Sequence, residues 1–415
     1  MCSLSHRKLR GTVSRLRIKP GSIPDSKTPA KDIPDMKPTI HEVVTPQQRH
    51  DVYRFRYDIY VEEMGRYRSV ADHDQRIFSE PEDETARLYY ATDGEQIVAT
   101  MRHNWGGDAP LCARQIEQYD LARFLKSISC EQMIVGERFM IAPSQRGTDL
   151  IFRLFQTYLN FVNEHRIQLI FGDCEPHLLN LYLGMGFRTY AERNVNSKET
   201  GYLVPLVMVP EDIAYMKQVK SPFVTLLQDY GDAAKVPGCL PELLSCGRMV
   251  VSHALTPQNE YQSEIDQAIQ LAENPTHLFD GLTEDECQRC LSKSNAIECM
   301  AGDHLIKAGN VAQNMFAVLS GTLEVRTGDH VVDVCCSGDI VGEMAFLLES
   351  PRAADVYVAT DGTRVLSLSE SNLKKLAVNE PQLAAKLLLN LSKLLCYKLL
   401  RAGQVGTLSQ PRLSE

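Results

Sequence analysis

The sequence predicts an α+β protein with an N-terminal mixed sheet with flanking helices and a C-terminal β-roll or jelly roll with terminal helices. Three observations support this fold class. The chain has 415 residues, which is too long for one ordinary core. Short apolar runs alternate with helical patterns up to about residue 216. After residue 276, glycines separate many short strand-like segments, a pattern typical of small antiparallel barrels.

Composition narrows the classes of protein to which the chain can belong. Hydrophobic residues make up 44% and charged residues 23% of the chain, as in soluble globular proteins. The formal net charge of -9 opposes binding to nucleic-acid phosphates. The N-terminus lacks the apolar stretch of a secretory signal, and no apolar run approaches the roughly 20 residues that cross a bilayer. We therefore expect a cytoplasmic protein with no nucleic-acid partner and no transmembrane segment.

The 12 cysteines are spread along the chain, as expected for reduced thiols in a cytosol. Cys287 and Cys290 form a CxxC pair, but one pair supplies only half of a zinc site and this one lies in a helical pattern. We interpret both as helix residues that pack in the interior. No metal site is therefore expected.

Composition also marks the boundaries between segments. Residues 1–38 are rich in Lys, Arg and Pro and poor in apolar clusters, which predicts a disordered basic tail. A connecting helix is expected at Asn259–Glu273, after a stretch of Pro, Gly and short apolar pieces. The predicted segments are the tail, 1–38; the first domain, 39–216; a linker with a helix, 217–275; the second domain, 276–404; and a C-terminal tail, 405–415.

The first domain shows strands and helices in alternation. Two strands are expected to form a hairpin across the Asp93-Gly94 turn, and further strands and amphipathic helices follow. Gly186 should end the last of these helices. The predicted elements are the hairpin strands Arg87–Ala91 and Gln96–Arg102, the strand Met133–Ile141, the helix Asp149–Glu164, the strand Leu169–Cys174 and the helix His177–Met185.

The second domain is expected to turn at its glycines and to end in helices. Ser371–Arg401 carries Leu, Ala and Lys at helical spacing, which predicts a helical stretch packed on the barrel or on the neighbouring domain. The turn signals that support the barrel are Gly302, Gly309, Gly321, Gly328, Gly338, Gly342 and Gly362.

The sharpest motif is Gly342-Glu343-Met344-Ala345-Phe346, followed by Pro351-Arg352-Ala353-Ala354. It resembles the phosphate-binding cassette of cyclic nucleotide-binding domains. A buried arginine can pair with the single negative charge of a cyclic phosphodiester while helix amides donate to the same oxygens. The resemblance implies that Arg352 binds the phosphate and Glu343 the ribose hydroxyl, with Gly342, Met344, Ala353 and Ala354 completing the site.

Two questions about this site remain open in the sequence. Ala353 stands where guanine-selective members of the family tend to carry threonine, so the resemblance favours cyclic AMP over cyclic GMP as the regulatory ligand. Tyr397 and Leu394 are candidates to cover the base. The alternative interpretation is that Glu343 and Arg352 form an ordinary ion pair.

The strand Met133–Ile141, its following loop and the next helix resemble the thioester-binding region of the GNAT acyltransferase fold. Tyr53–Glu63 and Glu137-Arg138-Phe139 resemble the autoinducer-synthase and N-acyl amino acid synthase branch of that fold, and Arg102 also fits the branch. Loop amides at a helix N-terminus form an anion site. The resemblance implies that Gln145, Arg146, Gly147 and Thr148 bind the donor, either acyl-CoA or acyl-ACP, so an acyl carrier protein is an expected partner.

The same resemblance implies roles for individual side chains in acyl transfer to an amine or amino acid. Glu137 serves as base or orients the amine, Tyr182 protonates the leaving thiolate, and amides near Phe139 stabilise the oxyanion. Arg56 and Arg102 hold a substrate carboxylate. The structural alternatives are packing for Tyr182 and an ion pair between Arg102 and Glu137.

We therefore predict an N-acyltransferase that moves an acyl group from a thioester to an amine under the control of cyclic AMP. A cyclic AMP-regulated protein lysine acetyltransferase is the second hypothesis. The third is a cyclic-nucleotide sensor with a degenerate, non-catalytic GNAT fold, because Thr148 or Asp149 stands where the usual donor loop has a second Gly or Ala.

Overall fold

A computed structural model of the chain describes residues 37–228, 236–244, 250–252, 263, 278–291, 294–311 and 313–408. The tail up to residue 36, the connecting helix expected at Asn259–Glu273 and the end of the C-terminal tail lie outside the described residues. Pro38–Glu415 group into a single unit.

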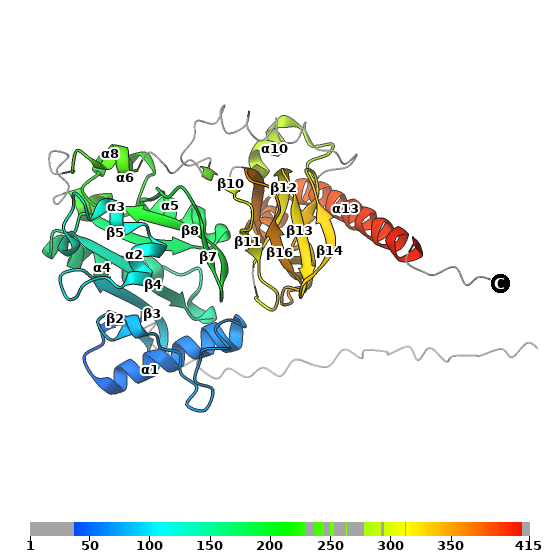
Figure 1. Cartoon of the computed structure of the whole chain (residues 1–415). Helices are drawn as coiled ribbons and strands as arrows, with labels where there is room; N and C mark the ends of the chain where they lie inside the picture. Colours follow the sequence, from blue (N-terminus) through cyan, green and yellow to red (C-terminus); the bar gives the residue numbers. More distant parts are fainter. Residues whose placement is uncertain are drawn as a thin grey trace, which may run out of the picture. The chain divides into compact units, whose positions relative to one another are not determined.

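The first domain is built on one mixed sheet with the strand order β1-β2-β3-β4-β5-β8-β6, in which β7 also pairs with β8 (Figure 1). Every neighbouring pair is antiparallel except β4 and β5. The strands are β1 (Thr39–Glu42), β2 (Arg87–Asp93), β3 (Gln96–Trp105), β4 (Met133–Ile141), β5 (Leu169–Cys174), β6 (Phe187–Thr189), β7 (Val195–Ser197) and β8 (Gly201–Met208).

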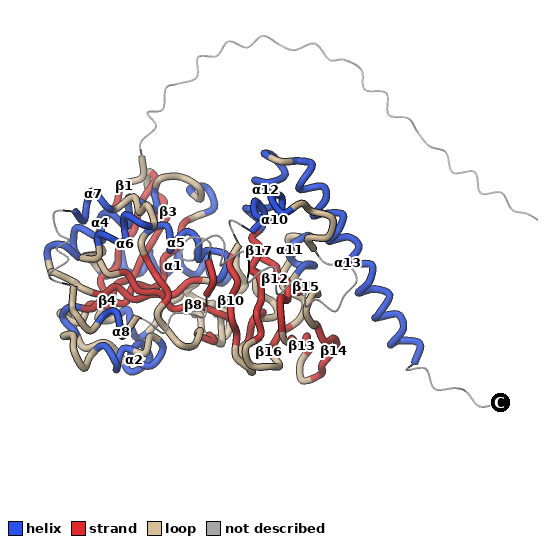
Figure 2. The backbone as a smooth tube through the Cα atoms, turned by 90° about the horizontal axis from the view of Figure 1, so that it is seen from above, coloured by secondary structure: helices blue, strands red, loops and turns tan. Residues whose placement is uncertain are grey.

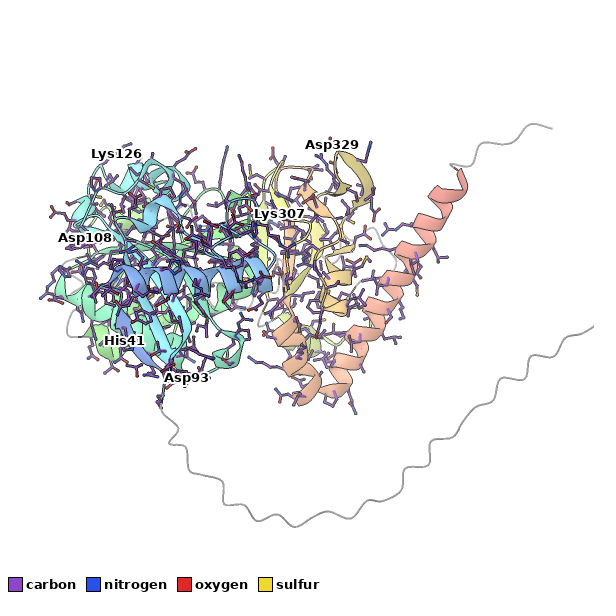
Figure 3. The ribbon with its side chains drawn as sticks, turned by 90° about the horizontal axis from the view of Figure 1, so that it is seen from below. His41, Asp93, Asp108, Lys126, Lys307 and Asp329 are labelled. Carbon is purple, nitrogen blue, oxygen red and sulfur yellow. The ribbon has the colours of Figure 1, made fainter. Side chains whose placement is uncertain are left out.

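Local signals explain where the elements of this domain begin and end. The predicted hairpin is confirmed, with Asp93 at its exposed tip (Figure 3). Thr45 and Gln48 form a capping box that starts the first helix. Gly186 ends α5 with φ 110°, a conformation that glycine adopts without a steric cost. The α-helices are α1 (Pro46–Tyr57), α2 (Ala113–Gln118), α3 (Leu121–Phe124), α4 (Leu150–Glu164), α5 (Leu179–Met185), α6 (Ile213–Gln218), α7 (Val224–Gln228) and α8 (Leu240–Leu243).

Short irregular helices connect these elements. A π-helical segment continues α1 directly, and single 3-10 turns precede several strands and helices. They are η1 (Asp58–Glu63), η2 (Pro81–Asp83), η3 (Cys130–Gln132), η4 (Pro143–Gln145) and η5 (Pro176–Leu178).

Helices cover both faces of the sheet because successive strand residues point to opposite sides. Ile134 and Ile170 share a core with α4, which buries Leu154 and Leu159. Their neighbours in the strands pack in a second core against α2 and α3. In Figure 2, α4 and α2 accordingly lie on opposite sides of β4.

The second domain is a roll of two antiparallel sheets, ordered β15-β12-β17-β10-β9 and β11-β16-β13-β14. Asp329 lies at the exposed tip between β13 and β14 (Figure 3). The strands are β9 (Val250–Ser252), β10 (Asn295–Cys299), β11 (His304–Ile306), β12 (Asn314–Ser320), β13 (Leu323–Thr327), β14 (His330–Cys335), β15 (Ile340–Val341), β16 (Asp355–Val358) and β17 (Thr363–Ser369).

The helical stretch expected at Ser371–Arg401 is divided into two helices. Pro381 begins the second of them, because proline lacks the N–H that an uninterrupted helix would need and is favoured at a helix start. Among the described residues, no helix combines the length and the apolar character needed to span a membrane. The helices of this domain are α10 (Glu284–Leu291), α11 (Glu343–Leu348), α12 (Glu370–Asn379) and α13 (Pro381–Leu408).

Candidate functional site

A cleft opens in the first domain where β4 and β5 part. The two strands pair from Met133 to Val135, and β4 then continues beside β3 to Ile141 while β5 pairs with β8. Within the continuing part of β4, Arg138 and Phe139 oppose the single residue Met101 of β3. This β-bulge includes a positive φ of 57° at Arg138. Bulges re-aim backbone groups and recur next to active sites.

Glu137, directly before the bulge, is held by a ring of donors. Its carboxylate pairs with Arg102 at 2.7 Å and with Arg114 at 3.0 Å. Gln115 and Tyr119 donate to it at 2.9 and 3.2 Å. Burial alone would raise the pKa of Glu137, but the two guanidinium groups outweigh burial and lower the pKa far below its usual range. Glu137 is therefore a fixed anion and a weak proton acceptor.

Arg56 and Arg102 lie inside this charged cluster and do not face an open cleft. Both side chains are fully buried. Arg56 pairs with Asp83 at 2.8 Å, and Arg102 pairs with Glu80 at 2.8 Å as well as with Glu137. Arg102 is compensated by Glu80, Asp83 and Glu137, whereas burial lowers the pKa of Arg56, whose Nε and Nη2 have no hydrogen-bond partner among the described residues. The ion pair between Arg102 and Glu137 is the alternative that the sequence had left open.

Tyr182 of α5 lies near the bulge, as the resemblance implied. It lines a small cavity together with Glu137, Phe139 and Asp173. Burial raises the pKa of Tyr182 well above its usual value, so its hydroxyl stays protonated and can serve as a donor. Its ring also packs edge-on against Phe187, with the centroids 5.5 Å apart. Packing and proton donation are compatible roles for the same side chain.

The expected donor loop lies before α4, between η4 and the helix N-terminus. Gln145 donates to Asp93 at 3.1 Å, and Arg146 pairs with Glu63 at 2.6 Å. Gly147 has φ 83°. The hydroxyl of Thr148 accepts from the N–H of Leu150 at 3.3 Å. The first turn of α4 and this exposed loop form a site to which an anionic group has access.

The cassette of the second domain surrounds the N-terminus of α11. Arg352 is buried and donates to the carbonyl oxygens of Gly342, at 2.7 Å, and of Asn314. Gly342 has φ 80°, and a side chain there would collide with the guanidinium of Arg352. Met344 is 56% exposed on α11. The first backbone N–H groups of α11 have no partner within the helix, and they lie beside the buried guanidinium of Arg352.

Glu343 does not pair with Arg352. Its carboxylate forms an ion pair with Lys398 of α13 at 2.9 Å. Among the described residues, no carboxylate lies within ion-pair distance of Arg352. Burial lowers the pKa of Arg352 to about 10, although Glu175 and Glu343 act in the opposite direction. The site therefore holds the buried positive charge of Arg352, which the protein's own carboxylates do not fully compensate.

A second small cavity connects the two domains beside this cation. Its volume is about 30 Å³, and Arg66, Glu175, Asn314 and Arg352 contribute to its lining. Arg66 is 3% exposed and donates to both oxygens of Glu175, at 2.6 and 2.9 Å. Glu175 directly follows β5, which forms one side of the cleft in the first domain. Glu175 and the cassette residue Arg352 therefore line the same cavity.

The backbone between these residues is bonded to both domains. Arg66 donates to the carbonyl of Val311 at 3.4 Å, and the N–H of Val311 donates to the carbonyl of Met64 at 3.1 Å. The N–H of Arg352 in turn donates to Asn310 at 2.9 Å. The segment 309–311 is thus held between the cassette and the first domain.

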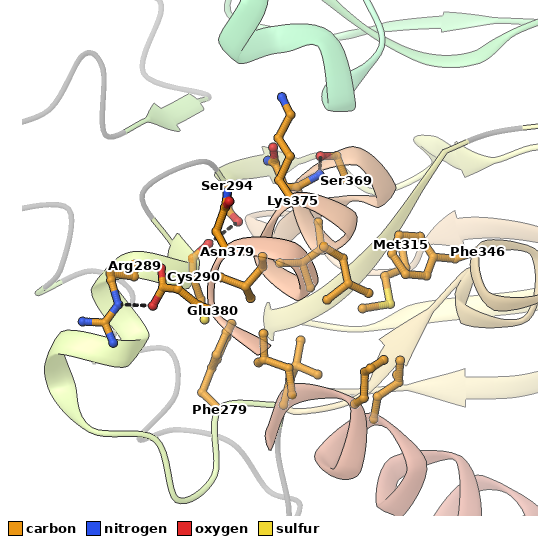
Figure 4. A pocket seen from close by; sticks show the side chains of 18 residues that line it. Phe279, Arg289, Cys290, Ser294, Met315, Phe346, Ser369, Lys375, Asn379 and Glu380 are labelled. Carbon is orange, nitrogen blue, oxygen red and sulfur yellow. Dashed lines mark hydrogen bonds and ion pairs between the residues drawn. The ribbon is translucent and has the colours of Figure 1, made fainter. Parts of the chain in front are cut away.

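A cavity of about 180 Å³ is lined by neither Arg352 nor Glu343. It is lined by α10, α12, α13 and the floor of the roll, with Phe346 and Met315 at one side and Arg289 bonded to Glu380 at the other (Figure 4). Phe346 belongs to α11, so the cavity adjoins the cassette helix through its apolar face.

Sequence reasoning missed the partners that hold these side chains. Arg114, Lys398 and the pair Arg66–Glu175 carry no motif and lie 23 to 109 residues from the groups that they contact. Arg66 follows the π-helix after α1 and pairs with Glu175. No local sequence pattern predicts this contact.

Two family models match the chain. Residues 51–208 match the model described as N-acyl amino acid synthase FeeM, and residues 296–380 match the cyclic nucleotide-binding domain. The first domain thus matches the N-acyl amino acid synthase family, and the second matches the cyclic nucleotide-binding domain. These matches confirm the two resemblances expected from the sequence.

Individual relatives match one domain at a time. A cyclic nucleotide-gated potassium channel of Rhizobium etli is 34% identical over 84 residues, which cover 20% of this chain and 23% of the channel. A cAMP-dependent protein kinase regulatory subunit of Yarrowia lipolytica is 26% identical over 121 residues, or 29% of this chain and 32% of that protein. The chain thus spans no more than a third of these two relatives.

Among solved structures, the N-acyl amino acid synthase FeeM from uncultured soil microbes is 16% identical to this chain. The alignment covers 46% of this chain and 98% of FeeM, with a TM-score of 0.35.

Proposed function

We propose that this chain, an N-acyl amino acid synthase domain joined to a cyclic nucleotide-binding domain, transfers an acyl group from a thioester to the amine of an amino acid or related small molecule, and that cyclic AMP controls the transfer. The observation that carries the proposal is the cavity that Glu175 and Arg352 share between the cleft and the phosphate site. A nucleotide bound at one site would thereby change charges next to the other.

The transfer step assigns a role to each part of the cleft. The amine nitrogen attacks the thioester carbonyl, and amides of the bulge near Phe139 stabilise the oxyanion. When the carbon–sulfur bond breaks, Tyr182 gives its proton to the thiolate, and the proton lost by the amine restores Tyr182. The overall products are an amide and a free thiol. Glu137 acts as a positioning anion for the amine, because its strong ion pairs make it a poor base.

The donor is held by its phosphate groups at Gln145, Arg146, Gly147 and Thr148. This assignment rests on the exposed loop before α4 and on the anion affinity of helix N-termini. Both acyl-CoA and an acyl carrier protein present a phosphopantetheine arm, so the loop serves either donor. Acyl-CoA carries the additional pyrophosphate that a helix N-terminus would favour.

The nucleotide is assigned to Gly342, Glu343, Met344, Arg352, Ala353 and Ala354. Its phosphate compensates Arg352, and its ribose hydroxyl takes the place of Lys398 on Glu343. Ala353 has no hydroxyl to meet a guanine, which favours cyclic AMP. Tyr397, beside Lys398 on α13 and 44% exposed, is the residue that we assign to cover the base.

Control of the transfer by the nucleotide follows from the charge of its phosphate and from thermodynamic linkage between the two sites. An anionic phosphate at Arg352 reduces the attraction between Arg352 and Glu175, so Glu175 depends more on Arg66. Arg66 lies on the segment after α1. Glu175 lies on the segment that leads to α5, which carries Tyr182. Any effect of nucleotide on the affinity for donor or amine must be matched by an equal effect of donor or amine on nucleotide affinity.

The test measures thiol release from acetyl-, butanoyl- and decanoyl-CoA with a mixture of amino acids, with and without cyclic AMP or cyclic GMP. For Tyr182→Phe we expect kcat to fall about 100-fold with KM for the donor unchanged. Tyr90→Phe, a buried tyrosine of β2 outside the cleft, is the matched control. Release of no thiol from any donor, while cyclic AMP still binds, would favour the sensor hypothesis.

A protein lysine acceptor is tested in the same assay by replacing the amino acids with a lysine-containing peptide. Turnover with the peptide alone would support the lysine acetyltransferase and contradict the small-amine acceptor. Turnover unaffected by either nucleotide would contradict the proposed control.

A further inference from the structure

Acyl transfer to an amine needs a group that accepts a proton from the amine. The α-amino group of an amino acid carries a proton at physiological pH, whereas only a neutral nitrogen can attack a thioester. Glu137 is a weak proton acceptor, because Arg102 and Arg114 hold it as a fixed anion. A second group near the cleft must therefore take the first proton of the amine.

Asp173 of β5 lies at the split between β4 and β5. It lines the cavity of about 30 Å³ together with Glu137 and Tyr182. Tyr182 comes from α5 on one face of the sheet, and α2 on the other face contacts Asp173 through Gln118 and Tyr119. A cavity of this volume has room for one water molecule. It thus connects Asp173 with the two side chains to which the proposed function assigns roles in the transfer.

Asp173 and Glu137 differ in their partners. Glu137 pairs with two guanidinium groups, whereas Asp173 forms no ion pair with any residue that the structure describes. Gln118 and Tyr119 each donate to Oδ2 of Asp173 at 2.8 Å. Within the described part of the chain, Oδ1 of Asp173 has no hydrogen-bond donor, and this atom is not fully buried. Neutral donors therefore fix one carboxylate oxygen, and the other stays accessible.

The surroundings of Asp173 make it a stronger base than an ordinary aspartate. Burial raises the pKa of Asp173 and Glu137 adds to the increase, while hydrogen bonds and Arg138 act in the opposite direction. The other titratable groups that face Asp173 or share its cavity are Tyr119, Tyr182, Tyr190, Cys174, His103 and Tyr158. All six are neutral at physiological pH, because burial raises the pKa of the tyrosines and the cysteine and lowers the pKa of the histidine.

We propose that Asp173 takes the first proton from the ammonium group of the substrate, through one water molecule in the cavity. The proposal rests on the proposed function, since it concerns the same transfer. The neutral nitrogen attacks the thioester, Tyr182 protonates the leaving thiolate, and the second proton of the nitrogen restores Tyr182. Asp173 then passes its proton to solvent. One ammonium ion and one thioester thus yield one amide, one thiol and one proton.

The test is the pH dependence of thiol release by the full chain from pH 6 to pH 10. Decanoyl-CoA and the amino acid mixture serve as substrates, with and without cyclic AMP. Asp173→Asn keeps the shape of the side chain, and we expect it to lower kcat/KM about 100-fold at pH 7. The loss should shrink as the pH approaches the pKa of the amine, because a neutral amine needs no base. Asp108→Asn, which alters a surface pair with Arg87 in the same domain, is the matched control and should follow the unaltered protein.

A second variant changes the basicity of Asp173 without replacing it. Gln118→Leu removes a hydrogen bond to Oδ2 that stabilises the carboxylate. The pKa of Asp173 should therefore rise, and the fall of kcat/KM in acid should begin about one pH unit higher. A fall that begins at the same pH as in the unaltered protein would contradict the proposed role of Asp173.

The remaining outcomes separate this inference from the proposed function. A loss in Asp173→Asn that is the same at every pH would overturn the inference, because it would indicate a structural role. An unchanged profile in Asp173→Asn would overturn it as well, while the proposed transfer would stand. Release of no thiol by the unaltered protein at any pH would instead contradict the proposed function.

Discussion

Arg102 and Arg352 are both buried arginines, yet their surroundings differ. Arg102 is surrounded by carboxylates, and these outweigh its burial and raise its pKa. Arg352 is bonded to carbonyl oxygens, and burial lowers its pKa to about 10. A compensated cation has a structural role, whereas an undercompensated one favours an incoming anion.

The first test removes the compensated cation. Arg102→Met should lower the free energy of unfolding by about 3–5 kcal/mol, because Glu137 and its neighbours would remain buried without their partner. Urea denaturation followed by circular dichroism measures the change. The exposed pair of Arg76 with Asp58 provides the control, and Arg76→Met should leave the free energy of unfolding nearly unchanged because water screens the pair. A loss below 1 kcal/mol in Arg102→Met would break the comparison.

The second test removes the undercompensated cation. Arg352→Met should weaken cyclic AMP binding at least about 100-fold, since the phosphate loses a buried charged partner. The stability should fall by only about 1–3 kcal/mol, because the carbonyl oxygens of Gly342 and Asn314 lose a donor but no buried carboxylate loses its ion pair. Calorimetric titration measures the affinity, and Arg364→Met on the exposed face of β17 serves as control. Unchanged affinity would show that the phosphate lies elsewhere.

The third test concerns Arg66 and Glu175, an intermediate case with one carboxylate for one buried arginine. Burial alone would raise the pKa of Glu175, but Arg66 and His177 lower it to about 2. Because the folded-state pKa lies below the unfolded value of about 4.3, this group stabilises the fold fully above that value and loses its contribution as the pH falls toward 2.

Stability measured from pH 7 to pH 3 checks this contribution. We expect the unaltered protein to lose on the order of 2 kcal/mol more than Glu175→Gln over that range. Glu62→Gln, in an exposed pair with Arg76, should follow the unaltered protein closely because water screens the pair. Equal losses in the unaltered protein and Glu175→Gln would contradict a buried ion pair at the domain junction.

Local patterns were sufficient for much of the fold. The predicted strands Met133–Ile141 and Leu169–Cys174 have the observed bounds, because alternation and apolar runs depend on neighbouring residues. The Asp93-Gly94 turn and Gly186 were recognisable because few residues adopt their backbone conformations. The helical spacing from Ser371 to Arg401 predicted one continuous stretch, whereas the structure begins a new helix at Pro381.

The candidate sites divide in the same way. The amino-acid sequence by itself determined the cassette around Arg352 and the strand that carries Glu137, because their residues are close together and their chemistry is tied to a short backbone motif. Only the tertiary structure decided that Arg56 and Arg102 are already paired, that Lys398 meets Glu343, and that Arg66 joins Glu175. The physical reason is that the energy of a buried charge depends on partners brought within about 3 Å by packing, and packing distance is independent of separation along the chain.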